Sequence, residues 1–157
     1  MVKEAFFAGG SFWGIEAYFQ NIKGVKDTEV GYAGGNFENP TYQDVCKDTT
    51  GHSETVKVLY EDTVISYPDL IEAFFGSHDP RSSDFQDFLF GTQYKSIIFY
   101  GDEDEKQQAE KAISLLNLAG DHEHPVTTAV KPFTVFYPAE DYHQHYYAKH
   151  GISIKEV

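Results

Sequence analysis

The chain contains 157 residues, with 12 Lys and Arg against 25 Asp and Glu, which gives a formal net charge of −13 at pH 7. Such an acidic composition disfavours binding to nucleic acid or to an anionic membrane through the general surface. Aromatic residues make up 16% of the sequence, and this argues against intrinsic disorder, because disordered chains are poor in aromatics. The length suits one domain spanning residues 1–157.

Cysteine use and hydropathy narrow the class of protein further. Cys46 is the only cysteine, which excludes an intrachain disulfide framework and a cysteine-based structural zinc site. The sequence has no apolar run close to the ~20 residues that span a bilayer, and it does not open with a basic and then apolar leader. We therefore expect a soluble, cytoplasmic protein with no membrane or nucleic-acid partner.

Glycine and proline residues divide the first half of the chain into short elements. Apolar residues at helical spacing predict a helix over 12–22, which Gly24 ends. The polar stretch 36–52 contains the turn-forming pair Asn39-Pro40 and is predicted to be a surface loop. Three further segments have the short apolar or alternating patterns of strands: 4–8, 25–33 and 53–60.

The second half continues this mixture of helices and strands. Ser66, with Asp69 three residues later, resembles a helix N-cap, so a helix is predicted from there through Phe75. Residues 102–119 begin with a run of acids and continue with apolar residues at helical spacing, which predicts a longer helix. A second long loop is predicted over 76–91. The remaining predictions are a strand over 93–100, a last strand over 126–136 that Pro132 partly breaks, and an aromatic-rich terminal helix over 140–149.

Short helices among strands that are joined by long loops predict an α+β fold. We expect a two-layer α/β sandwich in which the helices pack on a mixed or antiparallel sheet. Binding and catalytic residues are concentrated on loops that a rigid scaffold positions, so the long loops are the expected location of the functional residues.

The most unusual segment is Gly9-Gly10-Ser11-Phe12-Trp13-Gly14. It places Ser11 at or beside the N-cap of the first predicted helix, where backbone N–H groups and a partial positive charge are available. A thiol at this position would have a lowered pKa, whereas a hydroxyl stays protonated and needs an adjacent base. The simpler interpretation is that Ser11 caps the helix. The spacing does not fit a nucleophile elbow, a Walker-type phosphate loop or a dinucleotide fingerprint.

Glu54 begins the predicted strand 53–60, directly after a loop that contains Gly51. If it faces inward beside aromatic residues, burial would raise its pKa and would let it serve as a proton donor. The alternative, which the local sequence favours, is an exposed glutamate on an edge strand. Tyr42 and Tyr94 flank this region and could donate hydrogen bonds from their hydroxyl groups, although isolated tyrosines are more often core residues.

Five histidines suggest a metal hypothesis: His122, His124, His143, His145 and His150. Residues two apart point to one face of a strand, but they diverge on a helix, where the second pair is predicted to lie. No cysteine completes a ligand set, so the sequence favours histidines that face solvent or are hydrogen-bonded in the core over a metal site.

Several motifs, taken in order, resemble those of the A-type peptide methionine sulfoxide reductases over most of the chain. The resemblance implies an α+β fold with a ferredoxin-like core, no bound cofactor and no metal. The matching motifs are Gly10-Ser11-Phe12-Trp13-Gly14, Gly31-Tyr32-Ala33-Gly34-Gly35, Asn39-Pro40-Thr41-Tyr42, Thr50-Gly51-His52-Ser53-Glu54, His78-Asp79-Pro80, Gly91-Thr92-Gln93-Tyr94-Lys95-Ser96 and Ala139-Glu140-Asp141-Tyr142-His143-Gln144.

The resemblance implies the chemistry of the site. In this family the residue that matches Ser11 is a thiolate or selenolate, which attacks the sulfur of methionine-S-sulfoxide, releases methionine and becomes a sulfenic or selenenic acid. Glu54 matches the proton donor to the sulfoxide oxygen, and Tyr42 and Tyr94 match its hydrogen-bond donors. The substrate is methionine sulfoxide, free or in peptides and proteins, so the activity repairs oxidised proteins.

The resemblance also implies a substrate pocket and an external reductant. Phe12 and Trp13 would hold the S-methyl group of the substrate, with Gly10 and His143 as further substrate-binding residues. The oxidised enzyme would be reduced by thioredoxin, glutaredoxin or glutathione.

The sequence departs from the family pattern at three points. Ser11 is not ionised and cannot pass through a sulfenic acid, which predicts an inactive serine form of a cysteine or selenocysteine enzyme. Leu89 stands where members of the family carry an aspartate, which makes that side of the pocket more apolar. Residues 140–157 contain no resolving cysteine, so we expect a parent enzyme of the one-thiol kind, unless Cys46 is the resolving thiol.

Two other functions are compatible with parts of the sequence. A natural binding module would recognise oxidised methionine without reducing it, and it would differ from the reductase by gaining no turnover on Ser11→Cys. A metal-dependent hydrolase that uses the histidines is a weaker hypothesis, for the reasons of spacing given above.

Overall fold

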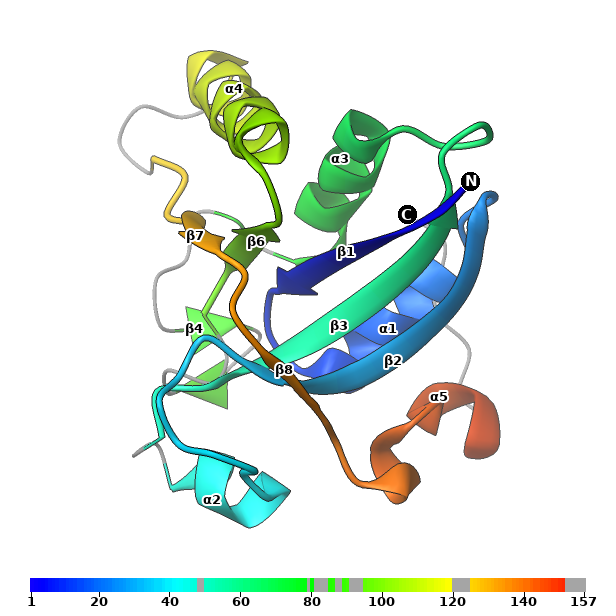
Figure 1. Cartoon of the computed structure of the whole chain (residues 1–157), viewed down its shortest axis with the longest axis vertical. Coiled ribbons are helices and arrows are strands. Elements are labelled where there is room, and N and C mark those ends of the chain that lie inside the picture. The colour runs from blue at the N-terminus through cyan, green and yellow to red at the C-terminus, as the bar shows by residue number, and fades with distance from the viewer. Residues whose placement is uncertain are drawn as a thin grey trace.

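The centre of the structure is a six-stranded sheet, in which the strands have the order β7-β6-β1-β3-β2-β8 (Figure 1). The computed structural model describes residues 1–47, 50–78, 80, 95–119 and 125–151, together with the backbone of 85–86 and 89–90. The strands of this sheet are β1 (Val2–Ala8), β2 (Val25–Ala33), β3 (Ser53–Glu61), β6 (Ile97–Tyr100), β7 (Ala129–Pro132) and β8 (Phe136–Pro138).

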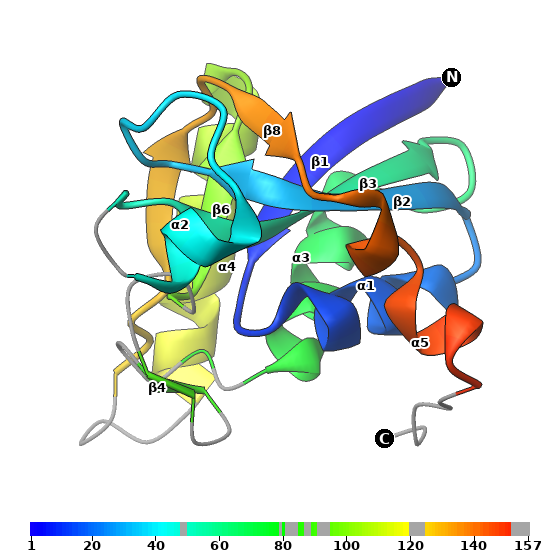
Figure 2. The same cartoon turned by 90° about the horizontal axis from the view of Figure 1, so that it is seen from below.

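The strands pair in both senses, so the sheet is mixed. β3 lies between β1 and β2 and is antiparallel to both. β6 and β8 are antiparallel to β1 and β2 respectively, whereas β7 is parallel to β6. The sheet is curled (Figure 2). The predicted α+β class and mixed sheet are confirmed, and the predicted strands 4–8, 25–33 and 53–60 correspond closely to β1, β2 and β3.

Three longer helices lie on one face of the sheet (Figure 2): α1 (Phe12–Gln20), α3 (Tyr67–Ser77) and α4 (Glu103–Ala119). The predicted N-cap of α3 is present, because the Ser66 hydroxyl accepts the N–H of Asp69 and the Asp69 carboxylate accepts the N–H of Ser66. None of the helices in the described parts of the chain is long and apolar enough to cross a membrane.

The remaining elements are short. They are α2 (Tyr42–Cys46), the 3₁₀ helix η2 (Asp141–His143), α5 (Tyr146–Lys149), and β4 (Phe85–Gln86) with β5 (Leu89–Phe90), which pair with each other. α2 falls within the surface loop that the sequence predicts over 36–52. The sequence signal that indicates this helix is a capping box, in which the side chain of Thr41 accepts the backbone N–H of Asp44 and the side chain of Asp44 accepts the backbone N–H of Thr41.

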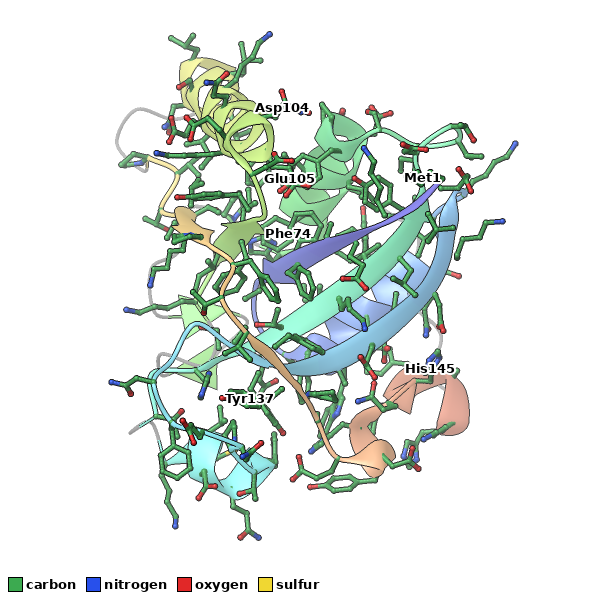
Figure 3. All side chains as sticks on the ribbon, viewed as in Figure 1. Met1, Phe74, Asp104, Glu105, Tyr137 and His145 are labelled. Atoms are coloured by element: carbon green, nitrogen blue, oxygen red, sulfur yellow. The ribbon has the colours of Figure 1, made fainter. Side chains whose placement is uncertain are left out.

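Aromatic side chains fill the core on both faces of β1. On the helical face, the Phe7 ring stacks with those of Phe19 and Phe74 at centroid distances of 5.3 and 4.9 Å, and Figure 3 shows Phe74 between α3 and β1. On the other face, Phe6 stacks on Phe133 at 4.0 Å. Phe133 lies in the segment between β7 and β8, which crosses this face (Figure 1). The strands at the centre of the sheet are therefore covered on both sides.

Two predicted elements near the C-terminus are wrong. The strand expected over 126–136 is divided into β7 and β8, which lie at opposite edges of the sheet. The division begins at Pro132, which has no N–H to continue the strand pairing. The helix expected over 140–149 is divided into η2 and α5 by His145, whose φ of 53° is left-handed and incompatible with a continuous helix.

Candidate functional site

The start of α1 lies at the end of β1, after a tight turn at Gly9 and Gly10. A side chain at Gly9 would meet the Phe74 ring at 2.8 Å, and Gly10 has a φ of 121°, so both positions require glycine. Ser11 follows as the N-cap residue and is half-buried, but its side chain makes no capping hydrogen bond to the described helix. The predicted position of Ser11 is confirmed, and its hydroxyl is not used as a cap.

Glu54 lies directly beside this helix start. The N–H of Phe12 donates to Glu54 Oε1 at 3.1 Å, and the side chain is buried, with 2% of the residue exposed. Its other oxygen, Oε2, has no hydrogen-bond partner among the described residues. Burial raises the pKa of Glu54 to about 8, and the hydrogen bond from Phe12 offsets only part of this effect. Glu54 is therefore mainly protonated at neutral pH and can donate a proton.

The interpretation of Glu54 as an exposed edge-strand residue is wrong. β3 lies between β1 and β2 in the order of the strands, so it is not an edge strand of the sheet. Glu54 is paired in register with Tyr32 of β2, which is fully buried. The side chain therefore projects from the centre of the sheet toward α1, where water does not reach it.

Aromatic side chains from three distant segments surround the first turn of α1. The Tyr42 ring of α2 lies 6.4 Å from that of Phe12, 6.3 Å from that of Trp13 and 4.4 Å from that of His143. Figure 2 shows how α2 and the segment that leads to α5 approach the start of α1. The structure thus brings together the predicted residues Phe12, Trp13, Tyr42 and His143, next to Glu54 and Ser11.

His143 is fully buried and neutral. The indole N–H of Trp13 donates to His143 Nδ1 at 2.9 Å, so the ring carries its proton on Nε2. That Nε2 has no hydrogen-bond partner within the described structure. Burial lowers the pKa of His143, although the charge of Glu140 works in the opposite direction. A hydrogen-bond donor is therefore available inside the aromatic group.

Glu140 is a residue of this region that the sequence analysis did not single out. Its Oε1 accepts from the Tyr32 hydroxyl and its Oε2 accepts from the N–H of Tyr42, both at 2.9 Å. Burial alone would raise the pKa of Glu140, but the hydrogen bonds from Tyr42 and Tyr32 outweigh burial and lower it. The site therefore holds one protonated and one ionised carboxyl group, and Glu140 fastens α2 to the C-terminal segment.

The other residues named from the sequence have different outcomes. Cys46 ends α2 and is exposed. Its pKa is raised by partial burial and by the charge of Glu140, against a hydrogen bond from Tyr42, so the thiol is not activated. Tyr94 and the side chain of Leu89 lie outside the described residues, so their predicted roles stay predictions.

The histidine spacing and the lack of a cysteine to complete a ligand set predict that the chain has no metal site. Within the described ranges, no group of three or more histidine, cysteine, aspartate or glutamate side chains is placed to hold a metal ion. His143 bonds to Trp13, and His145 lies against Gln20 and Asp27. His122 and His124 lie outside the described residues.

Comparison with known proteins shows the family of the chain. A sequence profile described as Peptide methionine sulfoxide reductase matches residues 3–157. The chain is 45% identical over 150 residues to "Peptide methionine sulfoxide reductase MsrA" of Methanosarcina acetivorans, and the match covers 96% of this chain and 80% of that protein.

Solved structures agree with this assignment. Methionine sulfoxide reductase A of Corynebacterium diphtheriae superposes with a TM-score of 0.87 at 32% identity, covering 98% of this chain and 77% of the other. Reduced Mxr1 of Saccharomyces cerevisiae superposes with a TM-score of 0.88 at 29% identity, covering 98% and 88%. Mxr1 in complex with Trx2 shares the fold at a TM-score of 0.63 and 23% identity, covering 92% and 84%. Since the profile match spans nearly the whole chain and the fold agrees, the chain belongs to the peptide methionine sulfoxide reductase family.

Proposed function

We propose that this chain binds methionine-S-sulfoxide at the start of α1 and that its cysteine or selenocysteine form reduces this substrate to methionine. The observation that carries the proposal is the protonated, buried Glu54 beside Ser11, with an oxygen that has no partner among the described residues. A sulfoxide oxygen is a strong hydrogen-bond acceptor, and it would satisfy that carboxyl group.

The proposed substrate lies with its S-methyl group against Phe12 and Trp13 and its oxygen toward Glu54. Tyr42 and Tyr94 are proposed to donate further hydrogen bonds to the oxygen, and Gly10 and His143 to line the pocket. The support for the apolar side is the burial of Phe12, at 1% exposed, and the packing of Trp13 and Tyr42 against it. The methyl group of a methyl sulfoxide requires an apolar wall, and its oxygen requires a proton donor.

The proposed reaction transfers oxygen from the substrate to the enzyme. A thiolate at position 11 attacks the sulfoxide sulfur while Glu54 protonates the oxygen; an S–S bond forms as the S–O bond of the substrate breaks, and the oxygen leaves as hydroxide with the electron pair of that bond. The hydroxide then attacks the enzyme sulfur; the S–S bond breaks with its electron pair on the sulfur of methionine, and the enzyme sulfur becomes a sulfenic acid. The sulfoxide is thus reduced by two electrons and the thiolate is oxidised by two. The positive end of α1 stabilises the thiolate.

Ser11 makes the present chain an inactive form in this proposal. Its hydroxyl is not ionised at neutral pH, and oxygen has no counterpart of the sulfenic acid. The competing proposal, a natural binding module for oxidised methionine, rests on the same Ser11. The two differ in what Ser11→Cys does: the reductase gains turnover, whereas the binding module does not.

Thioredoxin is the proposed reductant of the sulfenic acid, with glutaredoxin and glutathione as alternatives. The support is the solved complex of yeast Mxr1 with Trx2. Cys46 is proposed to take no part in recycling, because its pKa is raised and it is therefore a weak nucleophile.

The fold type forms part of the same proposal. The strands β6, β1, β3 and β2 are neighbours in that order, and the helices α1 and α3 connect them on one face. This arrangement supports the ferredoxin-like core that the family resemblance implies.

The serine chain itself allows a direct binding test. Titration with a peptide that contains methionine-S-sulfoxide is expected to give a measurable dissociation constant, and the R epimer and unoxidised methionine to bind at least about tenfold more weakly, which is ~1.4 kcal/mol. The reason is that only one epimer can place its oxygen at Glu54 and its methyl group at Trp13 together. Equal binding of the two epimers, or none of either, would contradict the proposed pocket.

A further inference from the structure

Glu16 is a buried acid to which the proposed reaction assigns no role. It lies one turn after Phe12 on the same side of α1, and 1% of the residue is exposed. Its Oε1 accepts the backbone N–H of His145 at 2.8 Å, and its Oε2 accepts the hydroxyl of Thr28 at 2.9 Å. A buried carboxylate is costly unless its oxygens accept hydrogen bonds, and both oxygens of Glu16 do so.

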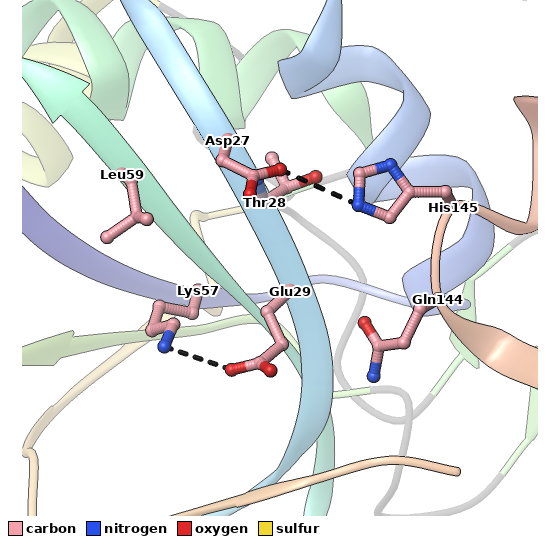
Figure 4. A pocket seen from close by; sticks show the side chains of 7 residues that line it. All are labelled: Asp27, Thr28, Glu29, Lys57, Leu59, Gln144 and His145. Atoms are coloured by element: carbon pink, nitrogen blue, oxygen red, sulfur yellow. Dashed lines mark hydrogen bonds and ion pairs between the residues drawn. The ribbon is translucent and has the colours of Figure 1, made fainter. Parts of the chain in front are cut away.

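Further contacts surround the bond between Glu16 and His145. Gln20 Nε2 lies 3.2 Å from the Thr28 hydroxyl and 2.7 Å from His145 Nδ1. Figure 4 shows the His145 ring directed toward Asp27, and 3.6 Å separates His145 Nε2 from Asp27 Oδ1. Both residues line a cavity of about 220 Å³. The His145 side chain is thus partly open to solvent, and its backbone N–H is the group that reaches the interior.

His145 is the point at which the C-terminal segment changes direction. Its φ of 53° and ψ of 40° separate η2 from α5. Because of this turn, residues on both sides of His145 contact the same side chain, Trp13. His143 accepts the indole N–H at 2.9 Å, and the Tyr146 ring stacks on the indole with centroids 4.0 Å apart and planes 10° apart.

We propose that Glu16 is a positioning residue for Trp13. By holding the N–H of His145 in its left-handed turn, Glu16 fixes the segment from which His143 and Tyr146 clamp the indole. Trp13 is a wall of the S-methyl pocket under Proposed function, so the consequence for substrate binding rests on that proposal. The consequence for the environment of Trp13 is independent of that proposal.

The chain offers a direct reporter, because Trp13 is its only tryptophan. Glu16→Leu removes both acceptors at similar size, and it is expected to shift the Trp13 emission to longer wavelength and to raise quenching by iodide or acrylamide at least about twofold. Glu16→Gln is expected to restore the native emission, because its oxygen can accept from His145 and its N–H₂ can donate to Thr28.

A matched control separates the backbone bond of His145 from its side-chain contacts. His145→Gly removes the contacts with Gln20 and Asp27, keeps the N–H that Glu16 accepts, and suits the positive φ. It is expected to leave the Trp13 emission close to native. If His145→Gly shifts the emission as much as Glu16→Leu does, the proposal is overturned, because the side-chain contacts then position the segment.

Kinetics in a Ser11→Cys background test the consequence for binding. Glu16→Leu is expected to raise KM for methionine-S-sulfoxide about tenfold, or ~1.4 kcal/mol, with a smaller change in kcat, whereas Glu16→Gln and His145→Gly keep KM within about twofold. If Glu16→Leu does not fold, Glu16→Asp takes its place, since its shorter side chain cannot reach both donors; it is expected to give a smaller change in the same direction.

Native emission and native KM in a folded Glu16→Leu or Glu16→Asp variant would overturn the positioning role. The two proposals fail separately. An emission shift together with no turnover in any Ser11→Cys variant would leave the clamp on Trp13 in place and remove the proposed reductase function. Turnover in the Ser11→Cys background, together with an unchanged Trp13 environment in the Glu16 variants, would support the proposed reductase function and remove the positioning role of Glu16.

Discussion

Replacing Ser11 with cysteine is expected to convert the chain into a reductase for methionine-S-sulfoxide. Without a reductant, about one methionine should be released per protein, because each thiol can be oxidised once. With thioredoxin or dithiothreitol present, turnover should rise from undetectable to the order of 1 s⁻¹. The physical reason is that the start of α1 lowers the pKa of a thiol but cannot ionise a hydroxyl. Chromatography of the released methionine measures both the single-turnover yield and the turnover rate.

Three controls make this result specific. Ser11→Ala should stay inactive, and the R epimer should give no methionine with Ser11→Cys. The double variant Ser11→Cys/Cys46→Ser should keep both the single-turnover yield and the rate of recycling. Loss of recycling alone would make Cys46 the resolving thiol. No turnover of a folded Ser11→Cys protein that binds the S epimer would instead favour the binding module over the reductase.

Replacing Glu54 with glutamine in the active background is expected to reduce kcat by about 10²–10⁴-fold, the range typical of a lost general acid. Glutamine has nearly the same size and can still accept the N–H of Phe12. The change therefore removes the acidic proton and keeps the shape of the side chain. The pH dependence should change with it. The pKa of Glu54 is about 8, so activity that depends on its proton should fall as the pH rises above this value, and Glu54→Gln should lack that decline.

The pH dependence of the free energy of unfolding gives a second measurement on Glu54, and it can be made on the original chain with Ser11. The pKa of Glu54 is about 8 in the folded state against an ordinary 4.5, so the folded chain holds this proton more tightly than the unfolded chain. The resulting stability is complete below pH ~4.5 and is lost as the pH rises toward 8, by up to about 1.4 kcal/mol per pH unit. Urea unfolding of Glu54→Gln should show a flatter dependence over this range, whereas the exposed-site control Glu4→Gln should follow the original chain. Identical slopes for Glu54→Gln and the original chain would contradict the raised pKa.

Local patterns predicted most of the regular elements because the relevant forces act within a few residues. Periodic apolar residues placed α1 and α4, and Ser66 with Asp69 three residues later gave the correct start of α3. The error in the C-terminal helix has a different cause. The turn at His145 is held by Glu16, which lies 129 residues earlier, and no local pattern contains that contact.

The candidate site was predictable only in part, because some of its features are local in the sequence and others depend on contacts between distant segments. A strand, two glycines, a serine and a helix are local features, and they placed Ser11 correctly at the start of α1. The burial of Glu54 depends on which strands flank β3, which is a property of the whole sheet. Glu140 was missed as a site residue because its partners, Tyr32 and Tyr42, come from β2 and α2.

The most direct test of the central claim is a crystal structure of the serine chain with a peptide that contains methionine-S-sulfoxide. Because Ser11 cannot react, the complex should be stable. We predict the sulfoxide oxygen within hydrogen-bonding distance of the free oxygen of Glu54, about 2.5–3.0 Å, with the S-methyl group against Phe12 and Trp13 and the sulfur facing the Ser11 hydroxyl. A bound sulfoxide that leaves Glu54 without a partner and turns its oxygen to solvent would contradict the account.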